Sequence, residues 1–162
     1  MKRVSKLGLA ALCSLCSVAT VSVVFAQGGP PPTPEQKAQN AVKVRQGLFD
    51  VQNFSFAPVA AMMRGAPFNA MVAETAAKRI EMTSSMIPDV FKTDTSKFTV
   101  TTKARESIWT NMSDFQQKAQ ALNMAAMNLE TAAMSGDAGM TKQAAVAVGK
   151  ACGSCHDQFK NK

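Results

Sequence analysis

Residues 151–157 read ACGSCHD, and this Cys-x-x-Cys-His run is the most informative stretch of the 162-residue chain. The spacing is the one that attaches a c-type haem, because two thiols bond covalently to the porphyrin and the adjacent imidazole ligates the iron. On a helix, Cys152, Cys155, His156 and Phe159 lie at i, i+3, i+4 and i+7, so all four project from one face. We therefore expect one haem c held by two thioethers to Cys152 and Cys155, with His156 as axial iron ligand and Phe159 packed against the ring.

Two other chemistries use the same cysteine spacing. A redox pair of the thioredoxin type opens a helix after a strand, whereas this pair lies at the far end of a helical pattern. A tetrahedral zinc site needs further ligands, and His156 is the only histidine in the sequence. Haem attachment is the interpretation that fits best.

Residues 1–26 have the pattern of an export signal. Three basic residues lie among the first six, an apolar and small-residue run follows over residues 7–24, and a small-residue cleavage site precedes Gln27. A retained membrane anchor is the alternative, because the apolar run is nearly long enough to span a bilayer. We favour cleavage, which predicts a periplasmic protein with no stable membrane anchor.

Cleavage would also simplify the cysteine chemistry and the charge. Cys13 and Cys16 lie inside the signal and lack a following histidine, so we assign them no role. The mature chain would keep 15 Lys and Arg (18 less the three of the signal) against 11 Asp and Glu. That mild surplus fits acidic partner surfaces or simple solubility. It lacks the basic stripe and aromatic platform of a nucleic-acid-binding protein, so we expect no nucleic acid partner.

The first half of the mature chain predicts two helices. Residues 27–33 are rich in Gly and Pro and are expected to form a disordered leader. Thr33 is a helix cap, and the first helix should run over about residues 34–63. Pro58 lies inside it and is expected to kink or split it. A second helix should occupy residues 69–87 and stop before the next proline.

The second half predicts two more helices after a polar connection over residues 88–102. The third should run over residues 103–133, because its apolar positions repeat by four and three. This apolar seam consists of Ile108, Met112, Phe115, Ala119, Leu122, Ala126, Leu129 and Ala133. The fourth should cover residues 138–160. No segment alternates with period two, so we predict an all-α fold: a four-helix, up-down-up-down antiparallel bundle with covalent haem. A coiled-coil oligomer is the structural alternative.

The topology locates the haem. In an antiparallel bundle, His156 should lie beside the starts of the first and third helices, at about residues 42–49 and 108–112. A methionine on the open side of the iron would hold it low-spin for electron transfer, whereas an apolar non-ligand leaves it open to gases. Met112 is the one methionine at a plausible height, and methionine on a core seam is more often filler. A stripe on the first helix should face the haem: Val42, Arg45, Phe49, Gln52 and Phe56.

This order of features resembles cytochrome c′, within the class II c-type cytochromes. Residues 43–46, KVRQ, resemble the family's first-helix Lys-Tyr-Arg-Gln pattern. Residues 64–68 resemble its glycine-proline-aromatic turn, and residues 106–109 its third-helix Glu-Ile-Trp. Residues 152–162 resemble its Cys-x-x-Cys-His-Asp-x-aromatic-Arg ending. The resemblance implies that residues 34–162 form a cytochrome c′-like bundle.

The resemblance also implies individual roles. Arg45 and Gln46 would contact the haem propionates, Phe49 would be the apolar residue of the distal pocket, and Trp109 would pack near the haem edge. Lys160 stands where the family commonly has arginine. It keeps the charge but lacks the planar fork of donors, which puts a role in the proximal pocket in doubt. An antiparallel homodimer through the first two helices is also implied.

Three functions remain open. The one we favour is a haem protein with five-coordinate, high-spin iron, His156 as proximal ligand, and NO or CO bound on the open distal side. Such a protein could also exchange electrons with periplasmic redox partners. A six-coordinate, low-spin electron carrier is the alternative, and it requires a methionine such as Met112 as axial ligand. A peroxidase or NO-reducing enzyme needs a distal acid–base group, and Arg45 and Gln46 are the only polar candidates near Phe49. We therefore do not expect an enzyme.

Overall fold

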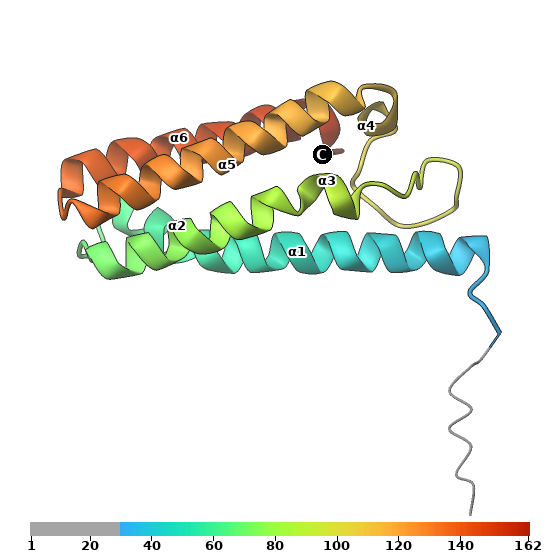
Figure 1. The fold of residues 1–162 in the computed structure, drawn as a ribbon, viewed down its shortest axis with the longest axis horizontal. Helices are drawn as coiled ribbons and strands as arrows, with labels where there is room; N and C mark the ends of the chain where they lie inside the picture. Colours follow the sequence, from blue (N-terminus) through green and yellow to red (C-terminus); the bar gives the residue numbers. More distant parts are fainter. Residues whose placement is uncertain (1–29) are drawn as a thin grey trace, which may run out of the picture. The chain divides into compact units, whose positions relative to one another are not determined.

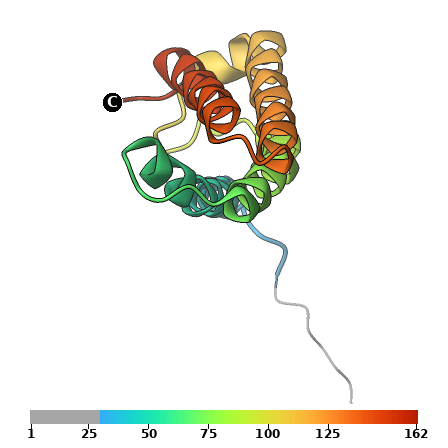
Figure 2. The same ribbon diagram turned by 90° about the vertical axis from the view of Figure 1, so that its left-hand side faces the viewer.

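A computed structural model of the protein describes residues 30–162, so the predicted export signal and the first residues of the leader lie outside the described residues. The unit formed by Pro32–Lys162 contains six helices. In chain order they are α1 (Pro34–Met63), α2 (Ala70–Ser85), α3 (Ile87–Val90), α4 (Ser107–Thr110), α5 (Met112–Met134) and α6 (Ala138–Phe159). The four long helices run side by side, with α1 and α2 below α5 and α6 (Figure 1). The end-on view shows them surrounding a common core (Figure 2). The predicted all-α bundle is confirmed.

The start of α1 follows from its cap. The Thr33 hydroxyl accepts a hydrogen bond from the Gln36 backbone N–H at 3.2 Å, and the Gln36 side chain accepts one from the Thr33 N–H at 2.8 Å. Together they satisfy two donors that a helix start leaves free. α1 continues through Pro58, so the predicted splitting at Pro58 is wrong. Ser55 and Val59 are buried on either side of Pro58, so this part of α1 packs into the core.

The predicted third helix begins later than expected and is divided. Asn111, with φ −130° and ψ 45°, separates α4 from α5. The backbone before α4 instead pairs with the end of α6, where the Arg105 N–H donates to Phe159 O at 3.0 Å and the Asn161 N–H donates to Lys103 O at 2.8 Å. These bonds hold Lys103 and its neighbours outside a helix. The predicted polar connection also contains the short helix α3, with proline in its first turn, where no N–H is needed.

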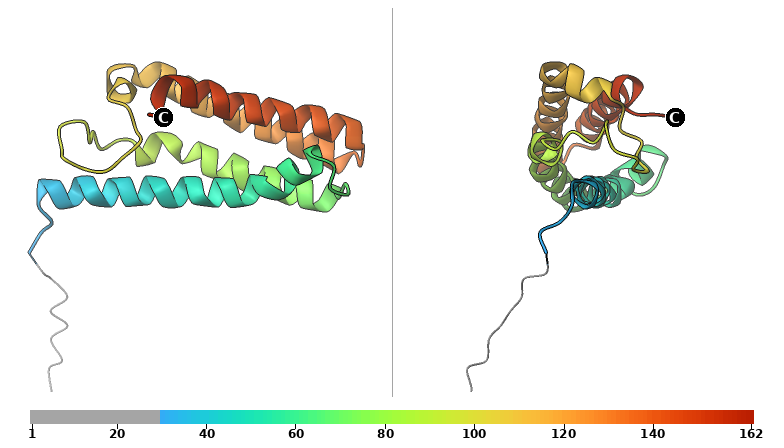
Figure 3. Two further views of the ribbon diagram at one scale, coloured as in Figure 1. Left: turned by 180° about the vertical axis from the view of Figure 1, so that it is seen from behind. Right: turned by 90° about the vertical axis from the view of Figure 1, so that its right-hand side faces the viewer.

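The core is made differently at the two ends of the bundle. Seven of the eight predicted seam positions are buried, and Met112 is the one that is only partly buried. Small residues line much of the contact between α2, α5 and α6, which lets these helices approach closely: Ala73, Ala76, Ala77, Ala119, Ala126, Ala133 and Ala145. α3, α4 and the last turn of α6 lie at one end of the bundle (Figure 3). At that end aromatic side chains take the place of the alanines in the core: Phe49, Phe91, Phe115 and Phe159. None of the described helices is long and apolar enough to cross a bilayer.

Candidate haem-binding site

A cavity of about 1050 Å³ lies at the aromatic end of the bundle. The whole predicted stripe of α1 lines it, and α6 supplies Cys152, Cys155, His156 and Phe159. Its remaining wall includes Ile108 and the extended segment before α4. The cavity is of the size that proteins use for small molecules and cofactors, about 300–1,000 Å³. The structure therefore brings together the side chains that the sequence predicted to share one site, with the exceptions of Met112 and Trp109.

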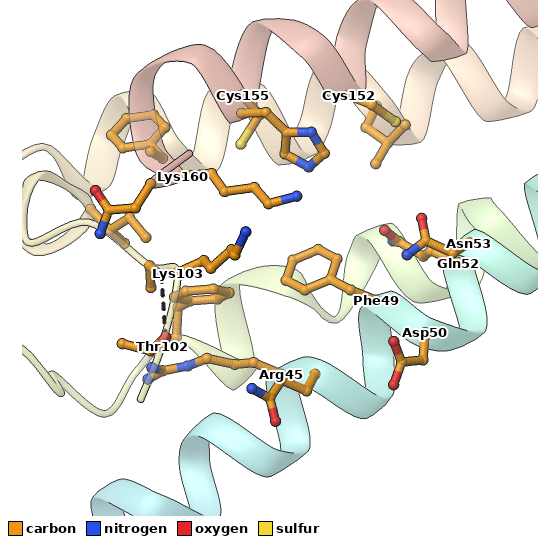
Figure 4. Close-up of a pocket in the computed structure, with 18 of the residues that line it drawn as sticks. Arg45, Phe49, Asp50, Gln52, Asn53, Thr102, Lys103, Cys152, Cys155 and Lys160 are labelled. Carbon is orange, nitrogen blue, oxygen red and sulfur yellow. Dashed lines mark hydrogen bonds between the residues drawn. The ribbon is translucent and has the colours of Figure 1, made fainter. Parts of the chain in front are cut away.

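Cys152 and Cys155 lie one turn apart on the cavity side of α6, and both are free thiols (Figure 4). Burial raises the pKa of both, that of Cys155 to about 11. Both thiols are therefore protonated at neutral pH, unlike the low-pKa thiolate of a dithiol redox catalyst. Residues 30–162 also bring together no group of three His, Cys, Asp or Glu side chains able to hold a metal ion, as a zinc site would require.

His156 follows Cys155 on α6 and lines the cavity. Burial, and next the positive charge of Lys160, lower the pKa of its imidazole, while Asp157 acts in the opposite direction. The imidazole is therefore neutral at physiological pH, which is the form that ligates iron. The arrangement gives one neutral nitrogen ligand beside two thiols.

Phe49 reaches into the cavity from α1 and faces the α6 wall that carries the two cysteines (Figure 4). Its ring also packs against Phe91, with ring centroids 6.2 Å apart. Met112 packs against the core outside the cavity. Among the described residues, no methionine lines this cavity.

Arg45 is 3% exposed and is held inside the protein. Its Nε–H donates to Val90 O at 2.8 Å, Nη1 donates to Thr95 Oγ1 at 2.9 Å, and Nη2 donates to Thr93 O. Burial lowers the pKa of this guanidinium, and the Asp94 carboxylate partly counteracts that effect. Arg45 thus fastens the segment after α3 to α1, while it also lines the cavity.

Trp109 packs against both Arg45 and Phe91. The Arg45 guanidinium lies 4.5 Å from the centroid of the Phe91 ring and 5.3 Å from that of Trp109. The Trp109 indole N–H donates to Phe91 O at 3.0 Å. Trp109 is not among the residues that line the cavity. It supports Phe91, which does line the cavity.

Sequence reasoning missed Lys103. Backbone pairing between Ala104 and Lys160 places Lys103 beside the end of α6, and both lysine side chains extend into the cavity (Figure 4). The ion pairs found in residues 30–162 involve other lysines, so these two ammonium groups add unneutralised positive charge. The only signal was the threonine-rich sequence before Lys103, which disfavours a helix.

Sequence reasoning placed Gln52 in the stripe but gave it no role. Its Nε2 is buried and has no hydrogen-bond partner in the described residues. A buried amide without a partner costs about 1–3 kcal/mol. Two thiols, a neutral imidazole, apolar walls and unneutralised cations match the edges, iron, faces and carboxylates of a haem. The residues present fit that group.

Comparisons with known proteins point the same way. Residues 40–160 match the sequence profile of the family described as Cytochrome C′. The chain is 36% identical over 131 residues to cytochrome c′ from Cereibacter sphaeroides, over 77% of this chain and 85% of that one. It is 34% identical over 128 residues to cytochrome c′ from Rubrivivax gelatinosus, over 78% of this chain and 98% of that one.

Solved structures share the fold. Cytochrome c prime from Shewanella frigidimarina superposes with a TM-score of 0.71 at 32% identity, over 77% of this chain and 97% of that one. The nitric oxide complex of a cytochrome c prime mutant from Alcaligenes xylosoxidans gives 0.68 at 28% identity, over the same two shares. A cytochrome c′ described by its unusual ligand-controlled dimer dissociation gives 0.70 at 27% identity, over 82% and 99%.

Proposed function

Because this chain belongs to the cytochrome c′ family, whose members carry a covalently attached haem c, we propose that it is a periplasmic gas-binding haem protein. Its iron is five-coordinate and high-spin, with His156 as the proximal ligand, and it binds NO or CO on the opposite, distal side. Members of the family are electron-carrying or gas-binding proteins rather than classical enzymes. The haem, when bound, supplies the open coordination position and the electron that a redox partner exchanges.

The observation that carries this proposal is the residue opposite the α6 wall. Phe49 occupies that position and has no atom that can ligate iron. The cavity, as far as the chain is described, has no methionine in its lining, and Met112 packs elsewhere. The related cytochrome c prime whose structure was solved with nitric oxide supports NO as a ligand.

The other side chains of the cavity attach and orient the haem. Cys152 and Cys155 form the two thioethers, and Phe159 packs against the ring. Positive charge is concentrated at one end of the cavity, where Lys103 lies, and we place the two propionates there. Arg45 and Gln46 also line the cavity. Arg45 has five N–H donors and uses three on its own chain, so it retains donors for a carboxylate.

An optical spectrum of the purified ferrous protein, followed by titration with CO and NO, tests the proposal. We expect a broad high-spin spectrum that changes on adding either gas. Sharp α and β bands before gas is added, with no response to CO, would instead establish a six-coordinate electron carrier. Recovery of the haem protein from the periplasmic fraction checks the location.

We also propose a homodimer formed through α1 and α2. Both helices expose large apolar side chains, with Phe54 71% exposed, Met71 75% exposed and Met82 69% exposed. Such exposure is typical of interaction surfaces. A related cytochrome c′ is described by its ligand-controlled dimer dissociation, which supports a dimer here.

A further inference from the structure

Leucine and methionine occupy different places in the described part of the chain. Residues 30–162 contain three leucines, and all three are buried in the core: Leu48, Leu122 and Leu129. The same residues contain ten methionines (11 in the chain less Met1), and seven of these are exposed. Leucine and methionine have nearly the same helix propensity and volume, so neither helix formation nor core packing accounts for methionine at the surface. The property that distinguishes methionine is the chemistry of its thioether sulfur.

Three of the exposed methionines lie on one face of α5. Met124 is 57% exposed, Met127 is 49% exposed and Met134 is 66% exposed. At about 100° per residue they fall within an arc of about 80°, on the side turned away from the buried Leu122 and Leu129. The core cluster of the described residues includes none of the three, and α5 lies outside the dimer surface proposed on α1 and α2. The sulfur atoms of this α5 methionine face (Met124, Met127 and Met134) are therefore open to small solutes, and the packing does not depend on them.

The chain holds little other sulfur that it can spare. Thiol and thioether sulfur are the side-chain atoms that electrophilic oxidants attack readily. Cys152 and Cys155 are the only cysteines after the predicted export signal, and the proposed haem attachment consumes both thiols. A sulfoxide on a core methionine would place a polar group among apolar side chains. On the α5 methionine face it would remain in water, so this sulfur can be oxidised without harm to the fold.

We propose that the α5 methionine face scavenges electrophilic two-electron oxidants of the hypochlorous acid class, a role beyond gas binding and electron exchange. The thioether sulfur attacks the chlorine, and the Cl–O bond breaks. Water then adds to the sulfur and chloride leaves, so each methionine becomes a sulfoxide with the net release of one chloride and one proton. The sulfur gives up two electrons, and the hypochlorous acid takes them. Each methionine consumes one equivalent of oxidant, and sulfoxide reductases restore it.

The haem-loaded protein with Met124→Leu, Met127→Leu and Met134→Leu together tests this role. Hypochlorous acid is added in steps smaller than one molar equivalent, and the loss of Soret absorbance reports destruction of the haem. The amount of oxidant that destroys half of the haem should fall by about three equivalents relative to the wild-type protein, one for each thioether removed. Met127→Leu alone should lower it by about one equivalent.

Met62→Leu, Met63→Leu and Met112→Leu together form the matched control. These three methionines are only partly exposed, and the control removes the same number of thioethers as the test variant. It should lose its haem within about one equivalent of the wild-type protein. Peptide mass spectrometry of the wild-type protein should find sulfoxide on the α5 methionine face before it appears at Met112. Far-UV circular dichroism of the same sample should be unchanged.

An unshifted titration in the α5 triple variant, or an equal shift in the control, would overturn the proposal. Sulfoxide that appears at Met112 before Met127, or loss of the helical signal while the haem is intact, would overturn it as well. None of these readouts requires a bound gas. A failure of the scavenging role is therefore distinct from a failure of the proposed gas binding.

Discussion

Arg45 on α1 donates from Nη1 to the Thr95 hydroxyl at 2.9 Å, although the two residues are fifty positions apart. Thr95 is itself 2% exposed, so the bond is made inside the protein. Two further donors of the same guanidinium end on the carbonyls of Val90 and Thr93. One side chain thus fixes the segment that leads from α3 past the cavity.

Arg45→Lys is expected to loosen this segment, because lysine keeps the charge but cannot reach three acceptors with a planar fork. The loss should be about 1–3 kcal/mol in the free energy of unfolding, measured by denaturant titration of the holoprotein. Amide hydrogen exchange over residues 90–105 should also accelerate. Arg64→Lys, at an exposed position, should change neither measurement, and slow exchange retained in Arg45→Lys would show that other contacts hold the segment.

Covalent attachment through both cysteines can be checked by mass. The mature protein should carry one haem, with Gln27 as its first residue. Cys152→Ser should leave a single thioether, and Cys152→Ser with Cys155→Ser should lose haem in denaturant, because only coordination by His156 would then hold it. Haem that stays bound to the denatured double variant would contradict the assignment.

The starts of α1 and α2 were predictable because their signals are local. Thr33 with Gln36, and Asn69, cap helices with side chains within three residues of the backbone donors that they satisfy. The segment before α4 was wrongly predicted to be helical. Its backbone pairs with Phe159 and Asn161, which lie far along the chain, so the local sequence gives no sign of this pairing. The partners of Arg45 on the segment after α3 also lie far along the chain. The local sequence gave no sign of them, and the charge of Arg45 suggested a carboxylate partner instead.

The four-residue and three-residue repeat in the third predicted helix gave the buried face but not the break at Asn111. For Gln52, too, the sequence predicted one feature and missed another. Periodicity placed it on the cavity wall, and only the packing around it revealed that its amide has no partner. Lys103 required the observed pairing of Ala104 with Lys160.

Phe49→Ala is expected to accelerate the association of CO, because the ring that faces the α6 wall restricts entry. Its cost in stability should fall below the about 3–5 kcal/mol of a fully buried phenylalanine, since Phe49 is only partly buried. Stopped-flow mixing with CO measures the rate. Phe98→Ala serves as control, because Phe98 is also partly buried and does not line the cavity. Unchanged rates in folded Phe49→Ala would place this ring away from the gas.

Phe54→Glu is expected to convert the proposed homodimer to a monomer. Phe54 is 71% exposed on α1, and a carboxylate that is buried without a partner at an interface opposes association. Sedimentation velocity measures the oligomeric state. Met140→Glu is the control, because Met140 is 54% exposed on α6, outside the proposed surface. A dimer that persists in Phe54→Glu and dissociates in Met140→Glu would move the interface to α6.

Met112→Leu tests the one methionine that the sequence offered as an axial ligand. Met112 begins α5 and packs against the core rather than lining the cavity. Leucine has nearly the same volume, so the cost in stability should stay below about 1.5 kcal/mol. We expect the ferrous spectrum and the CO affinity to match those of the wild-type protein. Low-spin bands that are present in the wild type and vanish in Met112→Leu would show that the thioether reaches the iron, and the protein would then be an electron carrier with both axial positions filled.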